Sequence, residues 1–397
     1  MMPRSSTPAH DSAMLASLDV QAAGIKRVFH ERGYRSVEPL VLQPAEIFLN
    51  LSGEDIRRRI YVFTDPGGEE LCLRPDLTIP TCAMYLETNR QAKGGAKLCY
   101  NGTAFRYQPS DGARPSEFLQ AGVESLGARD REKADAEVIA LAMEACEGAG
   151  LKNYKVKIGD VGLFFALINA LDIPEIWRAR LKRYIWRPSE FEALLARLSG
   201  KKAKRSLTGP GAGLLGALSR LDEDQARAAL NDVLALAQIA PVGVRSPEEI
   251  SERLLAQASE ARMDPLSPKI VRLINGYLKV SGAPSAALSK MRRLMRQAGV
   301  NLSEALERIE RRLALMAAQG LDVEGMEFDA DFGRKLEYYT GFVFEMTVPA
   351  LSENAQIAGG GRYDTLLRKL GAPRGVPAVG CMIRTERLLL AVQEASA

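Results

Sequence analysis

Acidic and amide side chains that could hold an ammonium group occur in two stretches of the sequence. Asp76 lies in "LRPDLT", and Gln120 and Glu124 lie four residues apart in "EFLQAGVES". Arg106 in "FRYQ" and Arg334 in "FGRKLEYYTG" could each hold a carboxylate or phosphate through two parallel hydrogen bonds. Charge-assisted hydrogen bonds contribute about 1.5–3 kcal/mol each, so two or three that converge could support micromolar binding of a zwitterion. These residue types together predict a clamp for an amino acid.

Taken singly, the same residues also have structural interpretations. Asp76 is typical of a cap at a strand end or turn, and Arg106 of a surface ion pair. Gly359–Gly361 could cradle a phosphate, but a tight bend or a close approach of two backbones is favoured because no P-loop context surrounds it. Tyr338 and Tyr339 point to opposite faces if the chain is extended there, which leaves one in the core and one for a ligand.

Composition excludes several kinds of catalytic centre. The 397 residues contain only two histidines, His10 and His30, which argues against a histidine-based zinc site and against Ser/His/Asp or Cys/His centres. The five cysteines are scattered, as expected for reduced core thiols. No apolar run approaches the roughly 20 residues that span a bilayer, and the start of the chain is typical of a frayed tail and not of a signal peptide. We expect a cytoplasmic protein with no metal and no cofactor, whose net charge of +4 fits anionic ligands without requiring nucleic acid.

These polar residues need a scaffold, and the hydrophobic period changes twice along the chain. Helical spacing over 11–33 stops at Gly33, a typical place for a C-terminal cap. Strand-like segments follow as far as Gly159, with "DPGG" as a hairpin turn and one helix, "DREKADAEVIALAMEACEGAG", between the last two. The strands are "YRSVEPLVL", "RRRIYVFT", "ELCLRP", "KLCYNGTAFRYQ", "EFLQAGVES" and "YKVKIG".

Strand signals are absent from Val161 to Gln319, where helix caps recur instead. "PSEFEALLARLSG" and "SPEEISERLL" begin with capping patterns, and "GKKAKRSLTGPGAG" is typical of an exposed linker. "NLSEALERIERRLALM" has one apolar face, made of Leu302, Leu306, Ile309, Leu313 and Met316. Strands return at "MEFDADFG", "GFVFEMTV", "AQIAGGGRY" and "VPAVGCMI", before a final helix, "TERLLLAVQEA".

This order predicts an α+β fold, in which an antiparallel sheet flanked by helices is interrupted by an all-helical insertion domain. The expected parts are a flexible N-terminal tail (1–12), a core made of 13–160 and 321–397, and the insertion (161–320).

Seven segments follow one another in a recognisable order: "RGYRSVEPLVLQPAEIF", "LRPDLT", "FRYQ" with "EFLQAGVESLG", "DAE", "GRKLEYYTGFVFE", "GGGRYDTLL" and "PAVGCMIRTERLLL". In order and spacing they resemble the catalytic core of histidyl-tRNA synthetase. They most closely resemble its non-aminoacylating relatives, the regulatory subunits of ATP phosphoribosyltransferase. The resemblance covers residues 24 to about 150 and 328 to 393 and implies a class II aminoacyl-tRNA synthetase fold.

The resemblance also implies roles for individual residues in a histidine site. The matching residues are Asp76, Thr78, Gln120 and Glu124 for the ammonium and imidazole, Arg334 for the carboxylate, and Tyr339 and Tyr363, beside Tyr338, for the wall of the side-chain pocket.

Departures from the synthetase pattern favour the regulatory relatives. Because the sequence ends at Ala397, directly after the closing helix, we expect no tRNA-reading domain. Arg106 and Arg387 match nucleotide-contacting arginines, but "YQP" follows Arg106 in place of histidine, glutamate and arginine. Arg384 replaces a glycine that keeps space beside the nucleotide, so we expect it to crowd ATP; in the alternative it points outward and ATP still fits. "RPDLT" in place of "RPEGT" favours the regulator as well.

We therefore predict a non-catalytic regulatory subunit that binds free histidine and has no catalytic residues. Family resemblance implies a short-form ATP phosphoribosyltransferase catalytic subunit as partner, in the first step of histidine biosynthesis, and a homodimer through the region near Pro39 within a hetero-oligomer. One alternative is a ligase that forms histidyl-adenylate. Another takes the basic stretch 177–205 as an RNA-contacting arm, although a solvated helical face or a dock for an acidic partner is favoured.

Overall fold

A computed structural model describes residues 10–51, 54–108, 115–199, 212–218, 221, 223–236, 265–333 and 338–395. The chain divides into two compact units, 1–187 with 276–397 and 188–275. The predicted insertion, 161–320, has other bounds than the second unit, 188–275. That the insertion is a domain of its own stays a prediction. The predicted helix "SPEEISERLL", nearly all of the predicted linker and most of the N-terminal tail lie outside the described residues.

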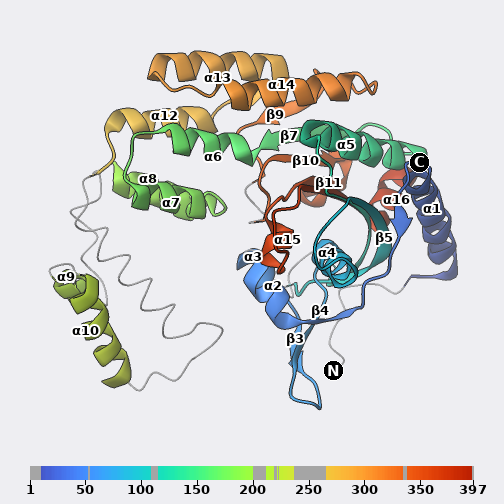
Figure 1. The fold of residues 1–397 in the computed structure, drawn as a ribbon. Helices are drawn as coiled ribbons and strands as arrows, with labels where there is room; N and C mark the ends of the chain where they lie inside the picture. The colour runs from blue at the N-terminus through green and yellow to red at the C-terminus, as the bar shows by residue number, and fades with distance from the viewer. Residues whose placement is uncertain are drawn as a thin grey trace. The chain divides into compact units, whose positions relative to one another are not determined.

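Nine strands of the described residues form one sheet in the larger unit, and its middle carries the candidate site (Figure 1). In spatial order they are β1 Arg35–Ser36, β5 Ala96–Phe105, β6 Glu117–Leu126, β12 Ala378–Arg384, β11 Gln356–Arg362, β10 Phe342–Thr347, β7 Lys155–Asp160, β9 Glu327–Asp329 and β8 Ser281–Gly282. The prediction of an antiparallel sheet is confirmed from β5 to β7, whereas β1 pairs with β5 and β9 with β7 in parallel, so the sheet is mixed. The two-residue strand β8 falls where no strand was predicted, because two residues are too few for an alternating pattern.

A small second sheet has the order β2-β4-β3, with bounds β2 Leu42–Pro44, β4 Glu70–Leu73 and β3 Val62–Thr64. Strands β3 and β4 are antiparallel and are joined by a turn in which the Gly68 amide donates to the Asp65 carbonyl at 3.0 Å. Gly68 has φ +88°, a conformation that glycine adopts without strain. The predicted hairpin is therefore confirmed.

Helices cover both faces of the large sheet. α1 Ser12–Glu31, α5 Arg131–Gly148 and α16 Thr385–Glu394 pack on one face, and α4 Thr78–Thr88 approaches β6 from the other (Figure 1). The remaining helices are α2 Ala45–Leu51, α3 Glu54–Arg57, α6 Val161–Ala170, α7 Glu175–Tyr184, α8 Pro188–Leu198, α9 Ala212–Leu218, α10 Glu223–Leu236, α12 Pro268–Leu278, α13 Pro284–Ala298, α14 Ser303–Ala317 and α15 Leu366–Lys369, with a 3-10 helix at Pro349–Asn354. None of the described helices combines the length and apolar composition needed to cross a membrane.

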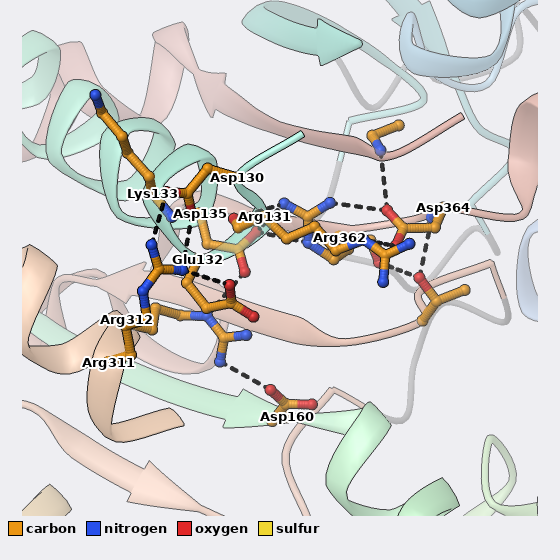
Figure 2. A network of polar contacts seen from close by, with 12 residues as sticks. Asp130, Arg131, Glu132, Lys133, Asp135, Asp160, Arg311, Arg312, Arg362 and Asp364 are labelled. Atoms are coloured by element: carbon orange, nitrogen blue, oxygen red, sulfur yellow. Dashed lines mark hydrogen bonds and ion pairs between the residues drawn. The ribbon is translucent and has the colours of Figure 1, made fainter. Parts of the chain in front are cut away.

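A buried network of charges joins α5 and α14 to the sheet (Figure 2). Arg312 of α14 donates to Asp135 of α5 and to Asp160 at the end of β7, both at 2.8 Å. Arg362 of β11 also donates to Asp135, at 2.9 Å, and to Asp364 at 2.8 Å. Breaking such a network on one side leaves an uncompensated buried charge, so it fixes the position of β11 relative to these helices.

Candidate ligand-binding site

The register of the sheet places the predicted binding residues of β6 on one face. Gln120 and Glu124 are four residues apart in a strand, so both side chains point to the same side. On β12, Arg384 lies opposite Gln120 and Gly380 lies opposite Glu124. Tyr100 of β5 pairs with Gly122 of β6, so its side chain points to the same side as Gln120 and Glu124. Tyr100 also packs against Leu77, which precedes the first residue of α4, and this is therefore the face that α4 approaches.

Glu124 is the centre of the site and is completely buried. Its Oε1 accepts a hydrogen bond from the Tyr100 hydroxyl at 3.0 Å, and its Oε2 accepts one from the Tyr363 hydroxyl. Burial raises the pKa of Glu124 to about 7, although the tyrosine hydrogen bonds oppose that rise. A Cβ atom on Gly380 would lie 1.8 Å from Glu124 Oε2, so only glycine fits beneath this carboxyl group. Near neutral pH the site can therefore present either a neutral or a charged carboxyl group.

Tyr100 joins three of the predicted residues and was not itself predicted. Besides Glu124, its hydroxyl oxygen lies 3.4 Å from Thr78 Oγ1 and 3.4 Å from Gln120 Nε2. Tyr100 is buried, and burial raises the pKa of its hydroxyl, which stays protonated. The alternation of β5 could have revealed it, because the residue that pairs with Gly122 must face the same side as Glu124.

Asp76 lies at the start of α4 and has two different oxygens. Its Oδ1 accepts the Ile79 amide at 3.1 Å, so Asp76 is a cap, but at the start of a helix and not at the strand end or turn that was predicted. Its Oδ2 is buried and has no hydrogen-bond partner among the described residues. Burial raises the pKa of Asp76, and the positive charges of Arg106 and Arg384 oppose the rise. One oxygen therefore serves the fold and the other is available to a ligand.

Three tyrosines form one wall of the site. The rings of Tyr338 and Tyr339 meet edge to face with centroids 4.9 Å apart, and Tyr338 and Tyr363 meet in the same way at 5.8 Å. The prediction for Tyr338 and Tyr339 assumed an extended chain, whereas Tyr338 lies in a turn before β10; the expectation that one of the two lies in the core is confirmed, since Tyr338 is buried and Tyr339 is half-buried. Thr340 anchors this turn, since its amide donates to the Arg362 carbonyl at 2.7 Å and its hydroxyl accepts the Asp364 amide at 2.9 Å. The wall is thereby tied to the charged network of Figure 2.

Two of the three predicted nucleotide-site arginines lie beside Phe118. The Arg384 guanidinium lies 3.6 Å and that of Arg106 5.5 Å from the centroid of the Phe118 ring. Arg384 is only 9% exposed, so the alternative in which it points outward is wrong. Arg106 Nε donates to the Pro75 carbonyl at 2.8 Å, and Arg387 Nη1 donates to the Gln356 carbonyl at 3.1 Å.

The remaining candidates from the sequence are Arg334 and the glycine run, and one surface hollow lies elsewhere. Arg334 lies outside the described residues. The glycine run Gly359–Gly361 lies inside β11, where a Cβ on Gly360 would be 2.3 Å from the Gly380 carbonyl oxygen, so the close approach of two backbones is confirmed. A hollow of about 460 Å³ near the C-terminal end of α13 and the start of α14 shares no residue with the site. The described residues of the candidate site form a cluster of side chains on the α4 face of the sheet.

Comparison with known proteins identifies what this arrangement is similar to. The family model described as histidyl-tRNA synthetase matches residues 16–248 and 248–388. The ATP phosphoribosyltransferase regulatory subunit of Brucella anthropi is 35% identical over 359 residues, which cover 90% of this chain and 93% of that protein. The protein of the same name from Mesorhizobium japonicum is 36% identical over 373 residues, which cover 92% and 96%.

Two solved structures share the fold. A crystal structure named as an ATP phosphoribosyltransferase regulatory subunit/histidyl-tRNA synthetase, from Bacillus halodurans, has a TM-score of 0.67 at 22% identity and covers 98% of this chain and 83% of that chain. Histidyl-tRNA synthetase from Nostoc sp. has a TM-score of 0.63 at 17% identity and covers 100% and 76%. At these identities the likeness concerns the fold, which is that of the class II synthetases.

Proposed function

The chain belongs to the family of ATP phosphoribosyltransferase regulatory subunits, built on the histidyl-tRNA synthetase fold, and from this premise we propose that it senses histidine for the enzyme's catalytic subunit. The partner is a short-form ATP phosphoribosyltransferase, which carries out the first step of histidine biosynthesis. Histidine bound here inhibits the assembly only if the inhibited state binds it more tightly, with a coupling free energy of about 1–3 kcal/mol.

One observation carries the histidine proposal: three predicted residues from two segments meet around Tyr100, and a fourth, from a third segment, joins them at Glu124. Glu124 and Thr78 lie within hydrogen-bond distance of its hydroxyl, as does Gln120, and Tyr363 completes the shell of Glu124. The free Oδ2 of Asp76 suits an ammonium group. An imidazole N–H could replace one tyrosine hydroxyl at Glu124, which gives the site a reason to prefer histidine to aliphatic amino acids.

We propose that the site performs no chemistry on the histidine it binds. The buried side chain of Arg384, stacked on Phe118, occupies a place where the synthetases keep a glycine, and this supports the loss of ATP binding. The role of the chain is then coupling between two proteins and not catalysis.

A homodimer is proposed at the small sheet. Apolar side chains that are 39–77% exposed gather on β2 and β3 and in the segment before β2; they are Leu40, Val41, Leu42, Val62 and Phe63. A group of this kind on one small sheet is typical of a surface that another protein covers, and a second copy of this chain is the occupant we propose. All five cysteines are free and buried, which supports the proposal that the protein is cytoplasmic.

The test is to mix the purified chain with a short-form ATP phosphoribosyltransferase and to measure turnover with and without histidine. We expect the chain to raise turnover and histidine to lower it, and we expect Glu124→Gln to keep activation while weakening inhibition. Absence of both activation and histidine sensitivity in the wild type would sink the proposal. Histidine-dependent exchange of pyrophosphate into ATP would instead favour the adenylate-forming ligase.

A further inference from the structure

Two buried atoms of the candidate site, from groups of opposite charge, lack hydrogen-bond partners among the described residues. They are Oδ2 of Asp76, a residue 4% exposed, and Nε of Arg384, a residue 9% exposed; neither atom has a partner in the part of the chain that the structure describes. A buried donor or acceptor without a partner costs about 1–3 kcal/mol, and more when the group is charged. Two such atoms in one site therefore point to a ligand that carries both a donor and an acceptor.

The position of Arg384 on the sheet directs it to the same site as Asp76. Arg384 lies directly opposite Gln120, so the two side chains share the face on which Glu124 lies. Gln120 Nε2 is 3.4 Å from the Tyr100 hydroxyl and thus belongs to the Glu124 cluster. Burial raises the pKa of Asp76, and the charge of Arg384 is among the effects that oppose this rise, as expected if the two groups are near each other.

Stacking holds the Arg384 guanidinium in an orientation suited to an anion. The centre of the guanidinium lies 3.6 Å from the Phe118 ring centroid, and its buried Nε has no hydrogen-bond partner among the described residues. Burial, followed by the charges of Arg106 and Arg387, lowers the pKa of Arg384 well below its usual range. An anion at its edge would offset both effects.

We propose that Arg384 binds the α-carboxylate of the amino acid whose ammonium group is held by Asp76 Oδ2. This inference rests on the proposed function and deepens it, because sequence comparison assigned the carboxylate to Arg334 and treated Arg384 as an obstacle to ATP. Arg384 then has two consequences. It fills the space of the nucleotide, and it binds the carboxylate that would have to attack ATP in adenylate formation. Arginine in place of glycine at this position therefore turns the carboxylate from a nucleophile into a group by which the ligand is recognised.

The test compares two ligands on two proteins by calorimetry with the full chain. Histidinol keeps the ammonium and imidazole of histidine but has no carboxylate. We expect the wild type to prefer histidine by about 10- to 100-fold, the range of a charge-assisted hydrogen bond. Arg384→Met should lose this preference and keep its affinity for histidinol. Arg368→Met, which removes an exposed arginine of α15, is the matched control and should behave as the wild type does.

The outcomes separate this inference from the function on which it rests. If Arg384→Met lowers the affinity for both ligands equally, or still prefers histidine, Arg384 does not bind the carboxylate. The proposal of histidine sensing is unaffected by that result. Arg384→Lys keeps the charge but not the planar guanidinium, so it should retain part of the preference for histidine over histidinol. This second variant keeps the test valid if Arg384→Met does not fold. A wild type that binds neither ligand overturns the proposed function as well. Loss of ATP binding in Arg384→Met with unchanged histidine affinity would assign the arginine to phosphate instead and would also overturn the inference.

Discussion

The buried carboxyl group of Glu124 predicts a specific pH dependence of stability. Its pKa rises from 4.5 to about 7 in the folded chain, with burial as the main cause. The folded chain therefore binds this proton more tightly than the unfolded chain does. The resulting stabilisation is fully present below about pH 4.5 and is lost as the pH rises through 7. At about 1.36 kcal/mol per pKa unit, the total is roughly 3.4 kcal/mol, of which about 2.5 kcal/mol is lost between pH 5 and pH 8.

The perturbation that isolates this effect is Glu124→Gln, because glutamine has nearly the same shape and does not titrate. Urea unfolding at a series of pH values gives the free energy of unfolding of both proteins, and urea leaves the ionic strength unchanged. Both tryptophans, Trp177 and Trp186, lie in the unit that contains Glu124, so their fluorescence reports on the right part of the chain. The difference, wild type minus variant, should fall by about 2.5 kcal/mol from pH 5 to pH 8.

A matched control and a clear negative result complete this experiment. Glu87→Gln removes an exposed glutamate at the end of α4, and its unfolding free energy should run parallel to that of the wild type. If the difference between wild type and Glu124→Gln stays constant across the pH range, Glu124 does not take up a proton on folding, and the reasoning from its burial is refuted.

Three further substitutions test the surroundings of Glu124 with the same urea series. Tyr363→Phe removes a hydrogen bond that lowers the Glu124 pKa, so the pH-dependent loss of stability should be centred higher than in the wild type; an unchanged centre would contradict that bond. Gly380→Ala places a methyl group where an ideal Cβ is 1.8 Å from Glu124 Oε2, and it should cost about 1–3 kcal/mol; a neutral effect would show that the carboxyl group can move. Arg312→Met leaves buried aspartates without their partner and should cost about 3–5 kcal/mol, whereas the exposed neighbour variant Arg311→Met should change stability far less; equal effects would contradict the importance of burial.

Local pattern predicted the strands of the site but not helix α4, since no helix was predicted between Gly33 and Asp130. The strand around Glu124 was visible from alternation, and the hairpin at Asp65–Gly68 from its turn residues. The grouping of Asp76, Gln120 and Glu124 was expected from family resemblance. The contacts of Gln120 and Glu124 with Tyr100 depend on strand register, which no single segment carries. The outward alternative for Arg384 failed because the aromatic face it covers belongs to a strand more than 250 residues earlier in the chain.

Long-range partners also explain what the helical pattern missed. The spacing in α14 predicted an apolar face with Leu313, but the structure buries Arg312 and leaves Leu313 only half-buried. A buried arginine is tolerated only with fixed anionic partners, and these are Asp135 of α5 and Asp160 of β7, about 150 or more residues away. Charge pairs of this kind have no period in the sequence, so hydrophobic spacing could not reveal them.

The way the site is assembled makes it suitable for regulation. Asp76 and Glu124 come from the first third of the chain, while the tyrosine wall and Arg384 come from its last sixty residues. Tyr363 sits between two residues of the charged network, Arg362 and Asp364, so a ligand that moves its hydroxyl away from Glu124 acts on β11 directly. A free energy of about 1–3 kcal/mol is enough to shift a regulatory equilibrium, and it is comparable to one hydrogen bond to a charged group. In the proposed complex with histidine, an imidazole N–H that replaced the Tyr363 hydroxyl at Glu124 would act through a hydrogen bond of the size that feedback control requires, without any covalent bond being made or broken in the ligand.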